Sequence, residues 1–117
     1  MKYLLLILTI LFSGCNNKTE VSVKNSTINE IDSVNVFITA ATYSFKEIAP
    51  GETRTITQVK TNIKGGADGS YLLNVYYQNG SVRPFVFGYY TNGYPVEDTI
   101  HITITDSTIE SKSGYRK

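Results

Sequence analysis

The sequence of 117 residues contains one cysteine, one histidine and no tryptophan. A lone cysteine excludes an intramolecular disulfide, so the fold depends on its hydrophobic core. A lone histidine, His101, leaves no second imidazole for a zinc cluster, and no motif places it beside a nucleophile. These absences leave few groups from which to build a catalytic site. We therefore expect no enzyme, no metal and no cofactor.

An excess of charge of one sign is also missing. Lys and Arg total 11 against 10 Asp and Glu, and the first fourteen residues carry only Lys2, so ten of each sign remain without them. Proteins that bind nucleic acid present clustered basic residues, and a polybasic segment is needed to hold anionic lipid by charge. We expect no nucleic-acid partner and no electrostatic attachment to a membrane.

The one long apolar run stands at the N-terminus. Lys2 precedes an apolar stretch over 3–12, and the small residues Ser13 and Gly14 follow it, which is the layout of a secretory signal peptide. The run is shorter than the roughly 20 apolar residues of a membrane span. An ordinary signal peptide with an incidental or structural cysteine is one interpretation, and the position of Cys15 favours another.

The segment LFSGC, residues 11–15, resembles the lipobox of bacterial lipoproteins, although Phe12 stands where Leu, Val or Ile is commonest. The resemblance implies lipidation of the Cys15 thiol, cleavage before it and acylation of the new amine. Asn16, rather than an aspartate, implies sorting to the outer membrane. We expect a signal peptide over 1–14 and a lipidated cysteine with a polar tether over 15–20. The membrane is then reached through the lipid alone, in a Gram-negative cell envelope.

Removal of residues 1–14 from the 117 leaves 103, enough for one domain. This part shows no apolar spacing typical of helices, and instead alternates with period two in segments rich in Val, Ile, Thr and Tyr. Strands are expected at 21–23, 34–38, 43–48, 52–59, 71–78, 81–90, 98–105 and 108–112. The pattern predicts an all-β fold, a single antiparallel β-sandwich of about seven or eight strands over 21–113, with a tail over 114–117.

Two local signals refine this expectation. Asn79-Gly80 lies between two apolar runs and predicts a hairpin with a type I′ turn, in which both central residues have positive φ. Pro84 has no N–H to donate to a neighbouring strand, so its strand is expected at a sheet edge or with a bulge.

The segments VSVKN, IAPGETRTI and DGSYLLNVYYQNG follow one another between residues 21 and 80. Their order resembles bacterial immunoglobulin-like and fibronectin III-like modules, which implies an Ig-like sandwich. The Cys, Trp and Cys of antibody domains are absent, so the resemblance concerns architecture only. Such folds host many functions, and the resemblance names none.

Six of the eight tyrosines that follow residue 14 lie between 71 and 94. Phe85, Phe87, Tyr71 and Tyr77 are expected in the core by their alternation. Three residues in and beside the loop after residue 90 are candidates for exposure and recognition: Tyr90, Asn92 and Tyr94. An exposed Tyr ring with an amide suits a sugar or a protein surface. The favoured alternative is that these rings cover a small core that lacks tryptophan.

Three segments fit Asp, then Ser or Thr, then an apolar residue or Thr. They resemble an O-glycosylation motif of one phylum of Gram-negative bacteria, which implies modification at Ser33, Thr99 and Ser107. The alternative is that Asp-Ser/Thr pairs open turns and strands. Calcium binding by Asp68, Asp98 or Asp106 has no D-x-D-x-D-G spacing behind it, and solvated turn acids are favoured.

These patterns predict a lipid-anchored, non-catalytic module that holds an envelope protein through its loops or an edge strand. A glycan-binding module that uses Tyr90, Asn92 and Tyr94 is the alternative.

Overall fold

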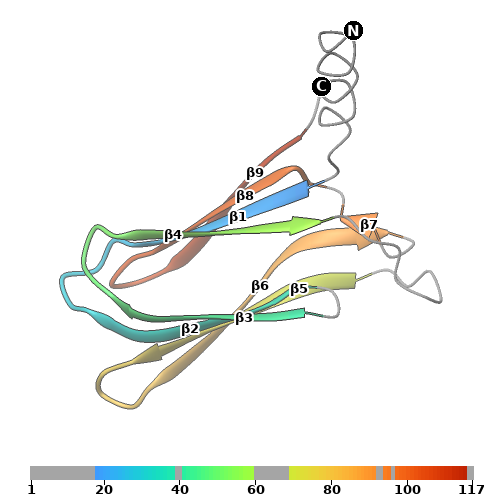
Figure 1. Ribbon diagram of the computed structural model, residues 1–117. Coiled ribbons are helices and arrows are strands. Elements are labelled where there is room, and N and C mark those ends of the chain that lie inside the picture. Colours follow the sequence, from blue (N-terminus) through green and yellow to red (C-terminus); the bar gives the residue numbers. More distant parts are fainter. Residues whose placement is uncertain (1–17, 39–40, 60–68, 92–93, 96, 116–117) are drawn as a thin grey trace, which may run out of the picture.

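The computed structural model describes residues 18–38, 41–59, 69–91, 94–95 and 97–115, and all of its regular elements are strands (Figure 1). They are β1 (Lys18–Asn25), β2 (Ile31–Ile38), β3 (Ala41–Ile48), β4 (Thr53–Val59), β5 (Gly69–Tyr77), β6 (Val82–Thr91), β7 (Tyr94–Pro95), β8 (Thr99–Ile104) and β9 (Ile109–Gly114). Among these residues, none belongs to a helix of the length and apolarity that a bilayer crossing requires. The predicted all-β class is confirmed, and β7 is an added strand of two residues.

The strands form two sheets that pack face to face (Figure 1). One has the order β4-β1-β8-β9 and the other β3-β2-β5-β6-β7. The predicted single sandwich is therefore confirmed. Every pairing is antiparallel except that of β1 with β8, which is parallel.

The strand order differs from that of constant-type immunoglobulin domains, which join the first, second, fourth and fifth strands in one sheet. Here β1 and β4 lie in one sheet while β2 and β5 lie in the other. The chain crosses between the sheets after β1, after β3, after β4 and after β7. The likeness to immunoglobulin domains is thus one of two-layer architecture.

The core lies between the sheets and follows the predicted alternation. Alternate residues are buried in β8, in β5 from Tyr71 to Val75, and in β2 from Val34 to Ile38, after a bulge in β2 between Ile31 and Ser33. The buried rows of β2 and β5, which lie in one sheet, face that of β8 in the other. Among the described residues, fifteen that are apolar make up the buried cluster: Val21, Val23, Ile31, Val34, Val36, Ile38, Ile48, Ile56, Tyr71, Leu73, Val75, Phe87, Ile100, Ile102 and Ile104. Branched aliphatic residues suit this position because they fill a pleated surface with few rotamers.

The first strand begins earlier than expected. Residues 18–20, expected as part of a tether, belong to β1. The Thr19 side chain is buried and its hydroxyl donates to the Glu97 carbonyl at 3.0 Å. The Glu20 N–H donates to the Asp98 carbonyl at 2.9 Å. Residues 18–20 are all polar, so no local alternation of apolar residues predicts a strand there. The strand is held instead by these hydrogen bonds to Glu97 and Asp98, which are distant in the sequence.

The predicted hairpin between β5 and β6 is confirmed, but its turn type is different. The Gly80 N–H donates to the Tyr77 carbonyl at 3.0 Å, and the Tyr77 N–H donates to the Ser81 carbonyl at 2.9 Å. Gly80 has φ of 89°, whereas Asn79 is not in the left-handed region. The loop is therefore a three-residue turn with one left-handed glycine rather than type I′. Asn79 accepts from the Ser81 N–H at 2.9 Å, which stabilises this form.

Candidate functional site

The two outer faces of the sandwich differ in polarity. Every described side chain on the outer face of β4, β1, β8 and β9 is polar. They are Thr53, Thr55, Thr57, Glu20, Ser22, Lys24, Thr99, His101, Thr103, Glu110 and Lys112. A β-sheet exposed to water on one side is expected to look like this.

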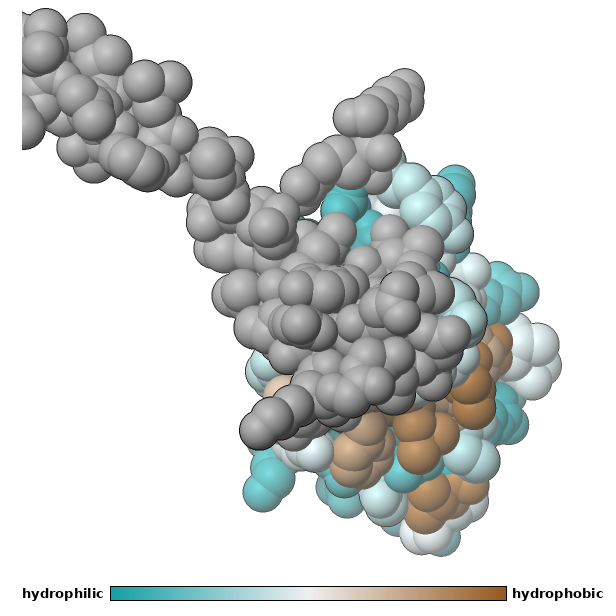
Figure 2. Space-filling model, turned by 90° about the vertical axis from the view of Figure 1, so that its right-hand side faces the viewer, coloured by the Kyte–Doolittle hydropathy of each residue, from teal (hydrophilic) through white to brown (hydrophobic). Residues whose placement is uncertain are grey.

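The outer face of the five-stranded sheet is apolar along β6 and its neighbours. Val86 is 65% exposed and Val82 is 51% exposed. Cross-strand pairing places Leu72 beside Val86 and Phe37 beside Leu72, while Tyr76 lies beside Val82. We name this surface the apolar strip: Phe37, Leu72, Tyr76, Val82, Pro84 and Val86. Figure 2 shows apolar residues gathered in the lower part of the molecule, where this sheet lies.

Two uncharged amides interrupt the strip on the same face. Asn74 lies between Leu72 and Tyr76 along β5 and pairs with both Asn35 and Pro84, and Asn35 accepts from the Ser44 hydroxyl at 2.8 Å. The centre of a protein interface is depleted of charged residues, and this surface meets that condition because its polar groups are uncharged. Contiguous exposed apolar surface on a small domain also marks interaction sites.

The edge of β6 itself is poorly suited to strand addition. The pair Tyr77 and Ser81 is hydrogen-bonded, so by alternation Pro84 opposite Asn74 occupies a position whose N–H would point away from β5. Proline leaves that position without a donor, and natural edge strands are protected in this way. The prediction that Pro84 lies at an edge is confirmed, and the side chains of the strip, rather than the backbone edge, form the candidate surface.

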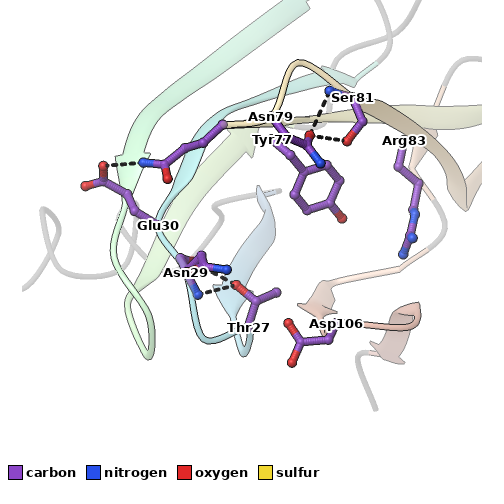
Figure 3. Close-up of a pocket in the computed structure, with 9 residues that line it drawn as sticks. Thr27, Asn29, Glu30, Tyr77, Asn79, Ser81, Arg83 and Asp106 are labelled. Carbon is purple, nitrogen blue, oxygen red and sulfur yellow. Dashed lines mark hydrogen bonds between the residues drawn. The ribbon is translucent and has the colours of Figure 1, made fainter.

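A polar hollow of about 440 Å³ opens at one pole of the sandwich. Three connections surround it: the segment 26–30 after β1, the turn 78–81 between β5 and β6, and the turn 105–108 between β8 and β9 (Figure 1). Its lining comprises Thr27, Asn29, Glu30, Tyr77, Gln78, Asn79, Ser81, Arg83 and Asp106. Figure 3 shows Tyr77, Arg83, Asn29 and Asp106 arranged around a common space.

Two of the three residues predicted for recognition have described backbones, which lie at the opposite pole. Tyr90 belongs to β6 and Tyr94 to β7, and Tyr90 pairs with Pro95. The side chains of Tyr90 and Tyr94, and all of Asn92, lie outside the described residues, as does Cys15. Their roles stay predictions. The core assignment of the other rings is confirmed for Tyr71 and Phe87, which are buried with ring centroids 5.6 Å apart.

The three predicted glycosylation residues occupy different settings. Ser107 is exposed in the turn between β8 and β9. Ser33 lies within β2, paired on both sides, and Thr99 lies in β8 between β1 and β9. Both are half-buried. Modification at each position stays a prediction, and Ser107 is the most accessible of the three.

One contact that no local pattern revealed joins Ser22 and His101. The Ser22 hydroxyl lies 2.6 Å from His101 Nδ1, and the two residues face each other in the parallel pairing of β1 and β8. His101 is exposed, as its alternation predicted. Among the described residues, no carboxylate hydrogen-bonds to the other ring nitrogen. The pair therefore has the serine and the histidine of a catalytic triad but not its acidic residue.

Glu97 is buried within the sandwich rather than solvated. Its carboxylate accepts from the Tyr89 N–H at 3.0 Å and from the Ser113 hydroxyl at 3.3 Å. It therefore links β6 of one sheet to β9 of the other. No group of three His, Cys, Asp or Glu side chains suited to a metal ion occurs in the part of the chain that the structure describes.

No family model and no curated protein matches the chain. A solved structure that is similar is an NMR structure of a protein from Eubacterium rectale, with a TM-score of 0.55 and 8% sequence identity. The likeness covers 86% of this chain and 92% of that one. At this identity it concerns the fold alone.

Proposed function

We propose that this chain is a lipid-anchored protein of the Gram-negative cell envelope that binds a protein partner through the apolar strip. The contrast between the two outer faces supports the proposal. One face follows the ordinary rule for a wet sheet, while the other exposes Val86 and Val82 by half or more. A partner with an apolar surface would remove this area from water.

The composition of the strip favours a protein over a lipid surface. Apart from Asp32, Lys46 and Glu47, the outer side chains of this face carry no charge in the described strands, so attraction to anionic headgroups is not provided. Asn35 and Asn74 offer both donors and acceptors among the apolar residues, which suits the backbone and side chains of a partner.

The proposed lipid anchor would leave the apolar strip accessible to a partner. Cys15 precedes Lys18 by three residues, which span at most about 10 Å. β1 begins at the pole that also carries β7 (Figure 1). A lipid on Cys15 would hold that pole near the bilayer, leaving the strip on the flank of the sandwich and the polar hollow at the far pole.

The test is quantitative affinity capture. The full-length chain, tagged at its C-terminus, is incubated with a detergent extract of its own envelope, together with the variants Val86→Lys and Thr55→Lys. Both substitutions add one lysine at an exposed strand position, on opposite outer faces. We expect one protein near equal stoichiometry with the wild type and Thr55→Lys, and about tenfold less or lower with Val86→Lys.

Two results would contradict the proposed surface. One is capture that is equal for Val86→Lys and Thr55→Lys. The other is a purified chain that light scattering shows to be dimeric, with the dimer lost in Val86→Lys, because the strip would then join two copies of this chain.

The anchor has its own prediction. Replacement Cys15→Ser removes the thiol that the lipid requires, so we expect the protein to move from the membrane pellet to the soluble fraction. Several acyl chains hold a protein firmly, whereas a chain without them has no comparable attachment here. Fractionation followed by intact mass measures this. A wild-type protein without lipid mass, or a Cys15→Ser protein that stays in the pellet, would exclude the anchor.

A further inference from the structure

We infer that the polar hollow binds a saccharide. It lies at the pole opposite the start of β1 and shares no residue with the apolar strip, so the inference is independent of the proposed protein-binding surface.

The hollow is where the inner rows of both sheets become polar. The inner row of β6 passes from buried Phe87 through half-buried Phe85 to Arg83. The inner row of β5 ends at Tyr77, and the inner row of β8 continues into the turn at Asp106. At this pole of the sandwich, the inner rows therefore end in one aromatic ring, one guanidinium and one carboxylate rather than in further aliphatic side chains.

These groups match the two kinds of surface on a sugar ring. The half-buried Tyr77 ring lines the hollow with the Arg83 guanidinium carbon 5.8 Å from its centre, and its remaining surface is apolar and suits the C–H side of a pyranose. Arg83 supplies only donors, Asp106 supplies only acceptors, and the Asn29 amide supplies both, which is what hydroxyl groups require. The Asn29 side chain and the Asp106 carboxylate make no hydrogen bond to other described residues, so these groups are available to a ligand.

Charge argues against the other simple ligands. One guanidinium and the two carboxylates of Glu30 and Asp106 share the hollow, so an anion would meet two like charges. Arg83 forms no ion pair among the described residues, and its guanidinium carbon lies 5.8 Å from the centre of the Tyr77 ring. A metal ion would meet that cation. A neutral ligand with many hydroxyls avoids both conflicts.

The walls are held in place before a ligand arrives. Asn79 accepts from the Ser81 N–H at 2.9 Å and from the Ser81 hydroxyl at 2.6 Å, which fixes the turn on one side. The Thr27 hydroxyl donates to Asn25 at 2.7 Å or to the Asn29 carbonyl at 2.8 Å, which fixes the other. Gln78 donates to Glu30 at 3.3 Å and bridges the two. Such preorganisation reduces the entropy lost on binding. The volume of about 440 Å³ is within the range of ligand pockets.

The test is isothermal titration calorimetry on the full-length chain in detergent. The probes are glucose, galactose, mannose, N-acetylglucosamine and their soluble β-linked oligomers, each to about 10 mM, with CaCl₂ as a separate probe. We expect saturable heat with at least one saccharide. Asp106→Asn and Arg83→Gln are each expected to weaken that binding by about 10- to 100-fold, because each removes a charged hydrogen-bonding group.

The matched control is Asp32→Asn, which removes an exposed carboxylate from another part of the surface and should bind as the wild type does. Thermal melts check that the variants fold. If a variant unfolds, NMR of the wild-type protein replaces it. The ring resonance of Tyr77, assigned by comparison with Tyr77→Phe, must then change its chemical shift as the same saccharide is titrated. No heat with any saccharide, or unchanged binding in both Asp106→Asn and Arg83→Gln, would overturn the inference. Heat with CaCl₂ alone would do so too.

Discussion

Asn25, the last residue of β1, joins two connections, the segment after β1 and the turn between β3 and β4. Its side chain is fully buried, and its amide donates to the Ile48 carbonyl at 2.8 Å and to the Asn29 carbonyl at 2.9 Å. Its side-chain oxygen accepts from the Thr27 N–H at 2.9 Å. Its own carbonyl accepts from the Gly51 N–H at 2.7 Å. Both ends of the amide are satisfied, which explains why the V-x-V-x-N pattern ends in asparagine.

The replacement Asn25→Asp tests this role with almost no change of shape. A carboxylate has no N–H, so the buried bond to the Ile48 carbonyl and the part-buried bond to the Asn29 carbonyl are lost, and both carbonyls face a negative charge. We expect a loss of about 2–4 kcal/mol in the free energy of unfolding, measured by urea denaturation. Asn35→Asp is the control, because Asn35 acts as an acceptor for Ser44 on the outer face. Equal effects at the two positions would show that Asn25 has no special role.

The turn before β4 contains an ion pair between Glu52 and Arg54. Pro50 and Gly51 occupy its centre, with Gly51 at φ of 82°, and the Glu52 N–H donates to the Ala49 carbonyl at 3.0 Å. The Arg54 side chain donates to Glu52 at 2.6 Å and the Ala49 N–H donates to it at 2.9 Å. These two bonds, with the Arg54 charge, hold the pKa of Glu52 below its ordinary value of 4.5.

A pKa that is lower in the folded chain stabilises the fold above the unfolded pKa, and the effect is lost as pH falls through the folded value. Glu52→Gln removes this titration. We expect the variant to melt slightly below the wild type at neutral pH and to converge with it as the pH falls below about 4.5. Thermal melts at a series of pH values measure the difference. A gap that does not narrow in acid would mean that the carboxylate charge contributes nothing.

At the scale of elements, β6 is shaped by a bulge at Gly88. The register with β5 shifts between Tyr71 and Gly69, and Gly88 has φ of 66°. A Cβ on Gly88 would lie 2.5 Å from Cδ2 of the Tyr71 ring and 3.1 Å from Cδ1 of Ile100. The bulge thus needs glycine for its backbone angle and for the close approach of a core ring.

Replacement Gly88→Ala therefore combines two penalties. Left-handed geometry costs a residue with a Cβ about 1–2 kcal/mol, and overpacking adds about 1–3 kcal/mol. Gly80→Ala is the matched control, since Gly80 has φ of 89° but a Cβ there would meet no atom within 4 Å. We expect Gly88→Ala to be the more destabilising variant in urea denaturation. Similar losses of unfolding free energy in the two variants would mean that the Tyr71 ring shifts to accommodate the added methyl group.

The strands could be predicted from the sequence because their alternation is local. Ile100, Ile102 and Ile104 indicated the buried face of β8, and Asn79-Gly80 indicated the hairpin. The parallel pairing of β1 with β8 was not predictable. The two strands are about eighty residues apart, and the sequence of neither strand indicates which strand lies beside it. The polar start of β1 was missed for the same reason.

The candidate sites were harder to predict than the strands. Alternation along the strand SVRPFVF placed Phe85 and Phe87 in the core and therefore Val86 on the other face, but it does not show whether that other face is covered. The apolar strip also depends on strand pairing, which brings Leu72 of β5 beside Val86. The hollow joins three connections that are distant in sequence. One signal was present: Arg83 shares its strand face with Phe85 and Phe87, and a charged residue on an inner row marks the end of a core.

At the scale of the whole molecule, the sandwich has three distinct surfaces. One outer face is polar, the other carries the apolar strip, and one pole holds the hollow. With the proposed lipid at the opposite pole, the strip would face sideways along the membrane and the hollow would face away from it. Under the two proposals, the protein partner binds at the flank of the sandwich and the saccharide at its far end.

The most direct measurement of the central proposal is site-specific photo-crosslinking in living cells of the native host. A photoreactive side chain replaces Val86 on the apolar strip or, in a second strain, Thr55 on the polar face. We expect irradiation to join position 86 to one envelope protein and to leave position 55 without that adduct. The same adduct from both positions, or no adduct from position 86, would contradict the assignment of the strip as the partner surface.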